Sequence, residues 1–344
     1  MPGCAAYTPV PIPDTLGFVE PGTEKFSTET QASLAVAAED AGFDAVLVPE
    51  TWGRDAFTRA GHIAAHTESV ALGTGIIPVH SRSPALVAQS IATLDELAGG
   101  RAILGLGLSS NYVIEQWHGI EFAPALRRQR ETIEIVRQAL SGDPLDYDGS
   151  LFDVEHFKMR FEPNPEITIA VGAQGPTNCE LTGGFADAWF PNRIPLSEMD
   201  QLREHVDRGA EKQDRDPTDV ETIPFATTCV LEDGERARER ASEEIAHYIG
   251  AMGDYTKESL TQLGFGDVAS EVDDLWQDDE KAAAREAVSD ELLDEITVSG
   301  TPTEAAATID RYGSETDGLV VLPAKAASED EIRETIDHIG AIRS

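Results

Sequence analysis

The feature that most constrains the fold is a rhythm in which short apolar runs alternate with amphipathic helical patterns from residue 15 onward. Runs such as AVLV, AILGLGL and GLVVL are continuously apolar instead of alternating, which is typical of parallel strands covered on both faces. Eight such strand–helix units favour a closed α/β fold, the (β/α)8 TIM barrel. A doubly wound open sheet is the alternative.

The predicted elements have the following bounds. The strands cover residues 15–20, 45–50, 70–78, 102–108, 167–171, 188–192, 223–232 and 318–324. The helices cover residues 28–41, 55–66, 84–98, 124–140, 176–183, 197–212, 235–250 and 329–342.

Two segments depart from the rhythm. Residues 251–300 separate the seventh helical pattern from the eighth strand, and their acidic surface and spaced leucines indicate an inserted helical segment. A polar stretch near 143–160 predicts a hairpin that turns at Asp148 and Gly149. We therefore expect residues 1–344 to form one barrel domain that carries this insertion.

The charge is strongly acidic: 63 Asp and Glu against 26 Lys and Arg give a net charge of −37, spread along the whole chain. With 41% hydrophobic residues in clear periodicity, the chain is expected to fold and not to be disordered. Its field excludes nucleic acid as a partner. Because molar salt screens charges beyond about 3 Å, we interpret the acidity as adaptation to the salt-rich cytoplasm of a halophile.

The sequence contains no apolar run of about 18 residues, so it predicts no membrane span. The N-terminus lacks the basic start and apolar stretch of a signal peptide, so a cytoplasmic protein is expected. The three cysteines, Cys4, Cys179 and Cys229, are far apart in the sequence. Without CxxC or Cys/His spacing, they predict neither a disulfide framework nor a metal site.

The segment GAQGP, residues 172–176, links the fifth predicted strand to a helix. Pro176 suits the first helical position, and free N–H groups at a helix start attract phosphate. Glycine-rich turns of this kind are also common between strands and helices without any ligand. Taken alone, the segment leaves both interpretations open.

Several longer motifs resemble the luciferase-like monooxygenase superfamily. They are PETWGRDAF, SVALGTGIIPVHSRSPALVAQSIATLDELAGGRAILGLG and VIEQWHGIEF. GAQGPTNCELTGGFADAW is similar to the phosphate loop in the branch that uses the deazaflavin coenzyme F420, which includes methylenetetrahydromethanopterin reductases. The resemblance covers roughly residues 15–250 and is weaker over 301–344.

This resemblance implies a cofactor that lies across the strand ends, with its ring against a bulge in the third strand. The bulge of the family commonly contains a non-prolyl cis peptide, which corresponds here to Gly75-Ile76. Ile76 and Ile77 would press on one ring face, and the backbone of residues 173–177 would hold the phosphate. The implied cofactor-binding residues are Gly75, Ile76, Ile77, Gly107, Ser109, Ser110, Asn111, Gly172, Ala173, Gln174, Gly175, Pro176 and Thr177.

Glu50 and Glu20 are the catalytic candidates that the resemblance implies. Several relatives place a histidine near the ring at the position of Glu50, and its absence makes simple alcohol dehydrogenation less attractive. Glu50 would hold a proton if burial raised its pKa, or would only pair with Arg54. Methanogenic reductases carry a carboxylate one position from Glu20, whereas their second carboxylate corresponds to Ser110. A tetrahydropterin substrate therefore stays open.

The leading hypothesis is an oxidoreductase that moves a hydride between reduced F420 and an electron-poor C=N, C=C or C=O group of a small molecule. Three alternatives remain: a methylenetetrahydrofolate or methylenetetrahydromethanopterin reductase of one-carbon metabolism, an FMN-dependent monooxygenase, and a non-catalytic carrier of the cofactor. The family also implies a homodimer or homotetramer.

Overall fold

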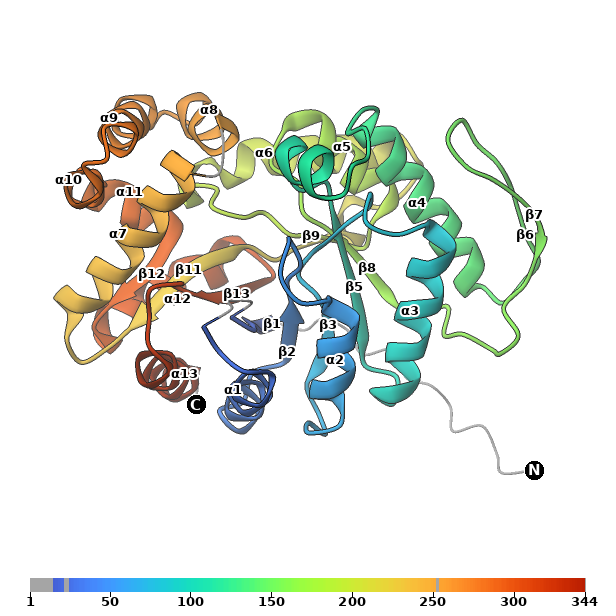
Figure 1. The fold of residues 1–344 in the computed structure, drawn as a ribbon, viewed down its shortest axis with the longest axis horizontal. Coiled ribbons are helices and arrows are strands. Elements are labelled where there is room, and N and C mark those ends of the chain that lie inside the picture. Colours follow the sequence, from blue (N-terminus) through green and yellow to red (C-terminus); the bar gives the residue numbers. More distant parts are fainter. Residues whose placement is uncertain (1–14, 22–24, 252–253, 344) are drawn as a thin grey trace.

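The computed structural model describes residues 15–21, 25–251 and 254–343, and their central feature is a closed parallel barrel (Figure 1). Cys4 and the predicted lack of a signal peptide concern residues outside this range. The barrel strands are β1 (Thr15–Val19), β2 (Ala45–Val48), β3 (Ala71–Thr74) with β4 (Ile77–Pro78), β5 (Ala102–Gly107), β8 (Thr168–Val171), β9 (Ala188–Trp189), β10 (Glu221–Thr222) with β11 (Phe225–Val230), and β13 (Gly318–Pro323).

Strand pairing closes the ring. The order runs from β9 through β8, β5, β3, β2 and β1 to β13, which pairs with β11. On the other side β9 pairs with β10, and the Phe225 N–H donates to the Pro191 carbonyl at 2.7 Å. The predicted TIM barrel is thereby confirmed, and the open doubly wound sheet is excluded.

The continuous apolarity of the strands follows from two separate cores. In β2, Ala45 and Leu47 belong to the cluster that fills the barrel interior, whereas Val46 and Val48 belong to the cluster beneath the outer helices. Because successive strand residues point to opposite faces, both sets must be apolar.

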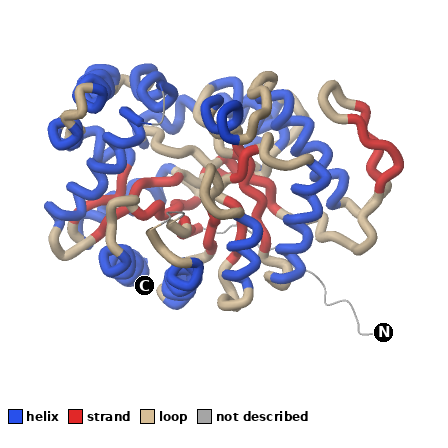
Figure 2. Tube along the Cα trace, in the orientation of Figure 1, coloured by secondary structure: helices blue, strands red, loops and turns tan. Residues whose placement is uncertain are grey.

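Eight helices surround the barrel (Figure 2). They are α1 (Thr28–Asp40), α2 (Ala56–Ala64), α3 (Pro84–Leu97), α4 (Ala125–Leu140), α5 (Pro176–Phe185), α6 (Met199–Glu211), α12 (Pro302–Glu315) and α13 (Glu329–Arg343). The sequence predicts all of them except α12, which packs against α13 and β13. Its start is marked by a capping box of Thr301 and Glu304.

The inserted segment contains α8 (Asp254–Gln262), α9 (Gly266–Gln277), α10 (Lys281–Glu286) and α11 (Asp290–Ile296), and it ends in a strand, β12 (Thr297–Gly300), that pairs with β11. The helix predicted at 235–250, α7 (Gly234–Ala251), is not the seventh barrel helix. It packs against α8, α9 and α10 as well as β11 and β12. The reason is its apolar face, in which Ile245 and Ile249 join a core made by the inserted helices.

The predicted hairpin is present as β6 (Leu145–Asp148) and β7 (Asp153–Phe157), which pair in antiparallel fashion at the right edge of Figure 1. Within the described ranges, no helix combines the length and the apolar content needed to cross a membrane.

Candidate active site at the strand ends

The bulge implied by the resemblance is present between β3 and β4. The Gly75–Ile76 peptide is cis, and the Ile76 carbonyl accepts a hydrogen bond from the Glu50 N–H at 3.1 Å. Ile76 packs against the barrel interior and is half-buried, whereas the side chain of Ile77 is fully buried beneath the outer helices. Because neighbouring residues of a strand face opposite sides, Ile76 alone of the two is placed to contact a ring at the barrel mouth.

Two glycines, Gly107 and Gly172, lie next to the Ile76 side chain. A Cβ atom added at Gly107 would lie 2.7 Å from Ile76 Cδ1, and one added at Gly172 would lie 3.6 Å from Ile76 Cγ2. The register explains this proximity, since Ile77 pairs with Leu106 and Leu106 pairs with Val171. The predicted ring site and the predicted phosphate loop are therefore adjacent in space.

The loop of residues 172–175 is anchored and leads into an open helix start. The Trp189 indole N–H donates to the Ala173 carbonyl at 2.8 Å, and the Gln174 amide donates to the Asn192 carbonyl. Helix α5 begins at Pro176 without a side-chain cap, and Pro176 and Thr177 are exposed. First-turn N–H groups in this arrangement suit an anion such as phosphate.

The residues after β5 turn sharply. Ser109 has a φ of 62°, in the left-handed region, where a serine is strained. The Ser110 hydroxyl accepts a hydrogen bond from the Val113 N–H at 3.3 Å, and the Asn111 side chain accepts one from the Tyr112 N–H at 2.9 Å. These contacts shape the start of a short π-helix, η1 (Val113–Trp117), at the rim.

Glu50 is held by contacts with the protein. Its two oxygens accept from the Arg82 guanidinium at 2.6 and 2.8 Å, and one also accepts from the Ala56 N–H at 2.8 Å. The ion pair thus involves Arg82 and not Arg54, the partner considered from the sequence. Arg82 also pairs with Asp55, so this cluster ties the loop after β2 to the loop after β4.

Glu20 lies in a different environment. Its side chain is fully buried at the end of β1, where one oxygen pairs with Arg59 of α2 and the other has no hydrogen-bond partner. Burial raises the pKa of Glu20 to about 7, although the Arg59 and Arg54 guanidinium groups lower it. A carboxyl group with a pKa near neutrality is able to release and take up a proton at physiological pH.

Four residues that the sequence did not single out gather on the rim. The Arg193 guanidinium, after β9, lies 3.4 Å from the ring centroid of Tyr248 and pairs with Glu244 at 3.1 Å. The Lys325 ammonium, after β13, lies 4.8 Å from the same ring, and the Lys325 N–H donates to Glu244. Positions directly after strands were the only sequence signal for Arg193 and Lys325, and nothing indicated that α7 would reach them.

The described residues hold no cluster of three or more His, Cys, Asp or Glu side chains that could bind a metal ion. A closed parallel barrel whose strand ends carry a cis-peptide bulge, an open helix N-terminus and a buried carboxyl group has the organisation of a cofactor-binding barrel enzyme.

Comparison with known proteins identifies the family of this barrel. The chain belongs to the family described as luciferase-like monooxygenase, whose model matches residues 15–317. It is 31% identical over 325 residues to a protein of Mycobacterium tuberculosis classed as a coenzyme F420-dependent oxidoreductase, covering 89% of this chain and 93% of that protein. It is 29% identical to the 5,10-methylenetetrahydromethanopterin reductase of Archaeoglobus fulgidus, covering 78% and 81% of the two chains.

Among solved structures, the coenzyme F420-dependent tetrahydromethanopterin reductase of Methanopyrus kandleri has the same fold. The TM-score is 0.81 at 20% identity, over 95% of this chain and 97% of the other.

Proposed function

We propose that the protein is a coenzyme F420-dependent oxidoreductase that transfers a hydride to or from a small organic substrate. The observation that carries the proposal is the adjacency of the Ile76 bulge and the loop at 172–177, through the glycines between them. This arrangement provides a flat apolar support beside an anion site, which is what a ring cofactor with a phosphate requires. The names of the relatives support F420 over FMN.

Each part of the site has a role in this proposal. F420, when bound, supplies the hydride chemistry. Ile76 would lie against one face of its ring, and the first turn of α5 would hold its phosphate. Ser109, Ser110 and Asn111 border the ring edge. Glu20, with its raised pKa, exchanges the proton that accompanies the hydride, while Glu50 positions the loops through Arg82.

For the substrate, we propose an electron-poor C=N, C=C or C=O group. The methylenetetrahydropterins are one case, supported by the similarity to methylenetetrahydromethanopterin reductase. Such a role would place the enzyme in one-carbon metabolism in the cytoplasm. Two further candidates are an FMN-dependent monooxygenase, favoured by the family match, and a non-catalytic carrier, favoured by the missing histidine at Glu50.

Cofactor choice and turnover are tested in sequence. Purified protein in about 2 M KCl, which screens its charge, is titrated with F420 and with FMN. Tighter binding of FMN would overturn the choice of F420. Reduced F420 is then mixed with imines, quinones and methylene-tetrahydrofolate, and its reoxidation is followed by absorbance. Oxidation by one of these acceptors is expected, whereas tight binding without oxidation by any acceptor would indicate a carrier.

A further inference from the structure

A second feature lies beside the barrel mouth: a pocket of about 550 Å³ between α7, the inserted helices α9 and α10, and the loop after β13. Lys325 and Ala326 form its barrel side, and His247 of α7 faces it. Trp276 and Lys281 close it from the insertion. The pocket therefore exists only because the insertion folds back toward the strand ends.

The pocket concentrates positive charge in a chain that has little. Six of the 344 residues are lysines, and two of them, Lys281 and Lys325, line this pocket. The Lys325 ammonium contacts the Tyr248 ring and has no carboxylate within ion-pair distance in the described part of the chain. Lys281 lies 5.5 Å from the Trp276 ring centroid and 3.3 Å from the exposed Asp279 carboxylate.

The carboxylates of the pocket are already engaged. Glu244 pairs with Arg193, and Glu243 accepts from Arg240 at 3.1 Å and lies 3.8 Å from Arg285. Because arginines compensate these two charges, Lys325 attracts an anion, and Lys281 adds to this attraction although it also pairs with the exposed Asp279 carboxylate.

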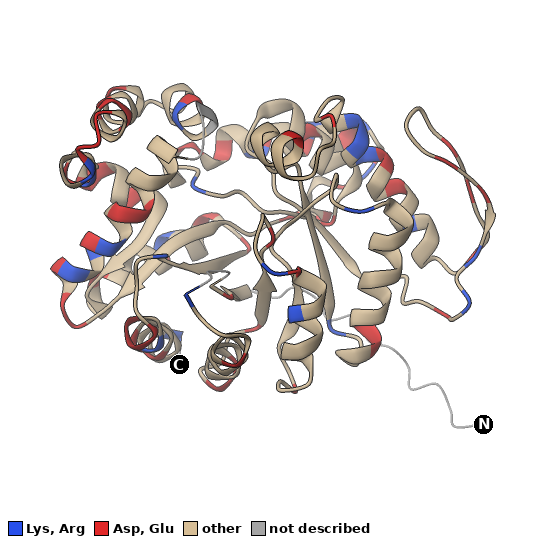
Figure 3. Ribbon diagram, in the orientation of Figure 1, with Lys and Arg blue, Asp and Glu red and all other residues tan. Residues whose placement is uncertain are grey.

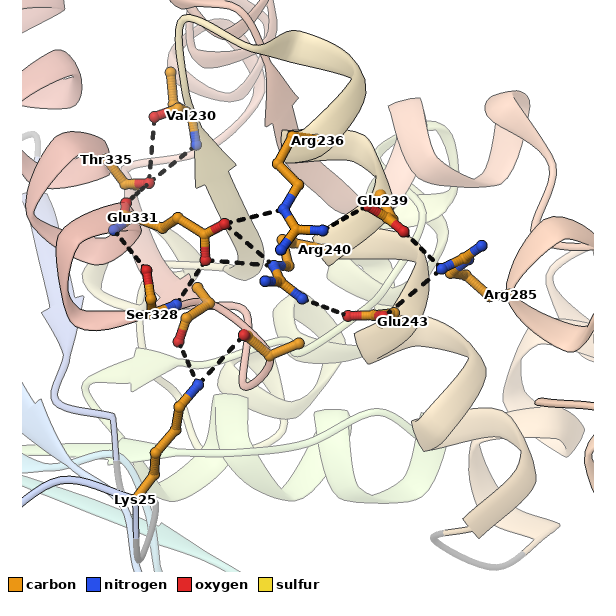
Figure 4. Close-up of polar contacts among 12 residues, drawn as sticks. Lys25, Val230, Arg236, Glu239, Arg240, Glu243, Arg285, Ser328, Glu331 and Thr335 are labelled. Carbon is orange, nitrogen blue, oxygen red and sulfur yellow. Dashed lines mark hydrogen bonds and ion pairs between the residues drawn. The ribbon is translucent and has the colours of Figure 1, made fainter. Parts of the chain in front are cut away.

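An ion-pair network fixes the pocket walls (Figure 4). Arg285 of α10 pairs with Glu239 of α7 at 2.7 Å, and Arg236 and Arg240 join α7 to Glu331 at the start of α13. Lys25 donates to the carbonyls of Ala326 and Ala327 at 3.3 and 2.9 Å and so fastens the loop after β13. A preformed wall lowers the cost of ordering on ligand binding.

The remaining wall is aromatic. The rings of His247 and Trp276 lie 5.6 Å apart, and the Trp276 indole lies directly on the α7 backbone, since a Cβ atom added at Gly250 would lie 2.1 Å from Trp276 Cγ. Burial lowers the pKa of His247, which keeps its ring uncharged at neutral pH. The two ring planes are inclined by 68°, so the pocket presents aromatic surface from two directions next to two ammonium groups.

We propose that this pocket binds an organic anion in which a carboxylate or phosphate is joined to a flat ring, and that this anion is part of the substrate. Lys325 lies just beyond β13, and Glu244 connects the pocket to Arg193 after β9, so the pocket borders the mouth on the side of these strands. The substrate assignment rests on the proposed function, whereas binding of the anion does not.

The test measures binding of phenyl phosphate to the cofactor-free protein by calorimetry. The double variant Lys281→Gln/Lys325→Gln is expected to bind it about tenfold or more weakly. The matched control is Lys257→Gln, a lysine of the insertion that pairs with Asp273 away from the pocket, and it should bind as the wild type does. Equal affinity of all three proteins for phenyl phosphate would show that this pocket does not bind the anion.

Two further measurements separate the possible outcomes. Neutral benzyl alcohol should lose no affinity in the double variant, and thermal unfolding should show that all variants are folded. F420 is then titrated into the same proteins. If the double variant weakens F420 as much as phenyl phosphate, the pocket holds an acidic part of the cofactor and the substrate assignment is wrong. If F420 binds to no protein while phenyl phosphate binds normally, the proposed function fails and the anion site stands.

Discussion

At the scale of single residues, two carboxylates that follow neighbouring strands have acquired different properties. Glu50 receives three hydrogen bonds from Arg82 and the α2 N-terminus, whereas Glu20 is buried with one oxygen unpartnered. The sequence pattern around both is similar, a carboxylate next to a proline after an apolar strand. Their difference arises from Arg82 and Arg59, which approach from separate loops and helices.

Glu20→Gln should change how stability depends on pH. The pKa of Glu20 in the folded protein, about 7, lies above its ordinary value of 4.5. Its contribution to stability is therefore fully present below pH 4.5 and is lost as the pH rises through 7. Because glutamine stays uncharged, the variant should not show this loss, which amounts to about 3 kcal/mol. The measurement is urea unfolding at a series of pH values in concentrated KCl.

The comparison for Glu20 is Glu50→Gln, which should be less stable than the wild type because it breaks the pair with Arg82. If the free energies of unfolding of the wild type and Glu20→Gln changed in parallel from pH 4.5 to 8, the raised pKa assigned to Glu20 would be wrong.

Gly105→Ala and Gly107→Ala should separate folding from binding. A Cβ atom at Gly105 would lie 2.0 Å from the backbone carbonyl of Thr74, which cannot move without breaking the sheet. A loss of about 3 kcal/mol is expected from this overlap. At Gly107 the obstacle is the end of the Ile76 side chain, which can rotate. Gly107→Ala should unfold near the wild-type temperature and bind F420 more weakly. Unchanged F420 binding would show that Ile76 does not contact the ring of the cofactor.

At the scale of elements, the sequence predicts what local pattern determines. Continuous apolar runs located the barrel strands, and the glycine-rich turn before Pro176 located the start of α5. The packing partner of an amphipathic helix is not encoded in its periodicity, so α7 was assigned to the barrel although it packs on the insertion. For the same reason the sequence did not predict β12, at the end of the inserted segment, or α12, which follows it. At the site, the Gly75–Ile76 bulge came from family resemblance, and the pairing of Glu50 with Arg82 depends on a fold that brings two loops together.

The phosphate role of α5 is tested by Thr177→Asp. Thr177 is exposed in the first turn, where a carboxylate interacts favourably with the helix dipole. The variant should therefore keep its stability or gain about 0.5 kcal/mol, while repulsion should weaken F420 binding about tenfold or more. Thr177→Asn, which has nearly the same shape without the charge, should bind F420 almost as the wild type does. If Thr177→Asp bound F420 as tightly as the wild type does, the proposed phosphate site at the start of α5 would be wrong.

At the scale of the whole molecule, Asp and Glu positions are marked along most of the helices in Figure 3, but α2 and α3 carry few charges. The one charged residue of α2, Arg59, is buried, and α3 has only the buried Asp95 and the exposed Glu96. The outward side of α3 also exposes Leu86 and Leu97, at 47% and 62%. Two chains of charge −37 repel each other over most of their surface, so this nearly uncharged face is where two copies can meet most favourably.

We therefore expect a homodimer through α2 and α3, which Leu86→Glu/Leu97→Glu should convert to monomers, because each interface would then bury four added carboxylates. The control is Phe157→Glu, which alters an apolar side chain of similar exposure, 56%, on the distant β7 hairpin. Sedimentation of the three proteins in about 2 M KCl, where long-range repulsion is screened, gives their masses. A dimer is expected for the wild type and the control. A monomeric wild type, or a double variant that stays dimeric, would show that the uncharged face does not join two copies.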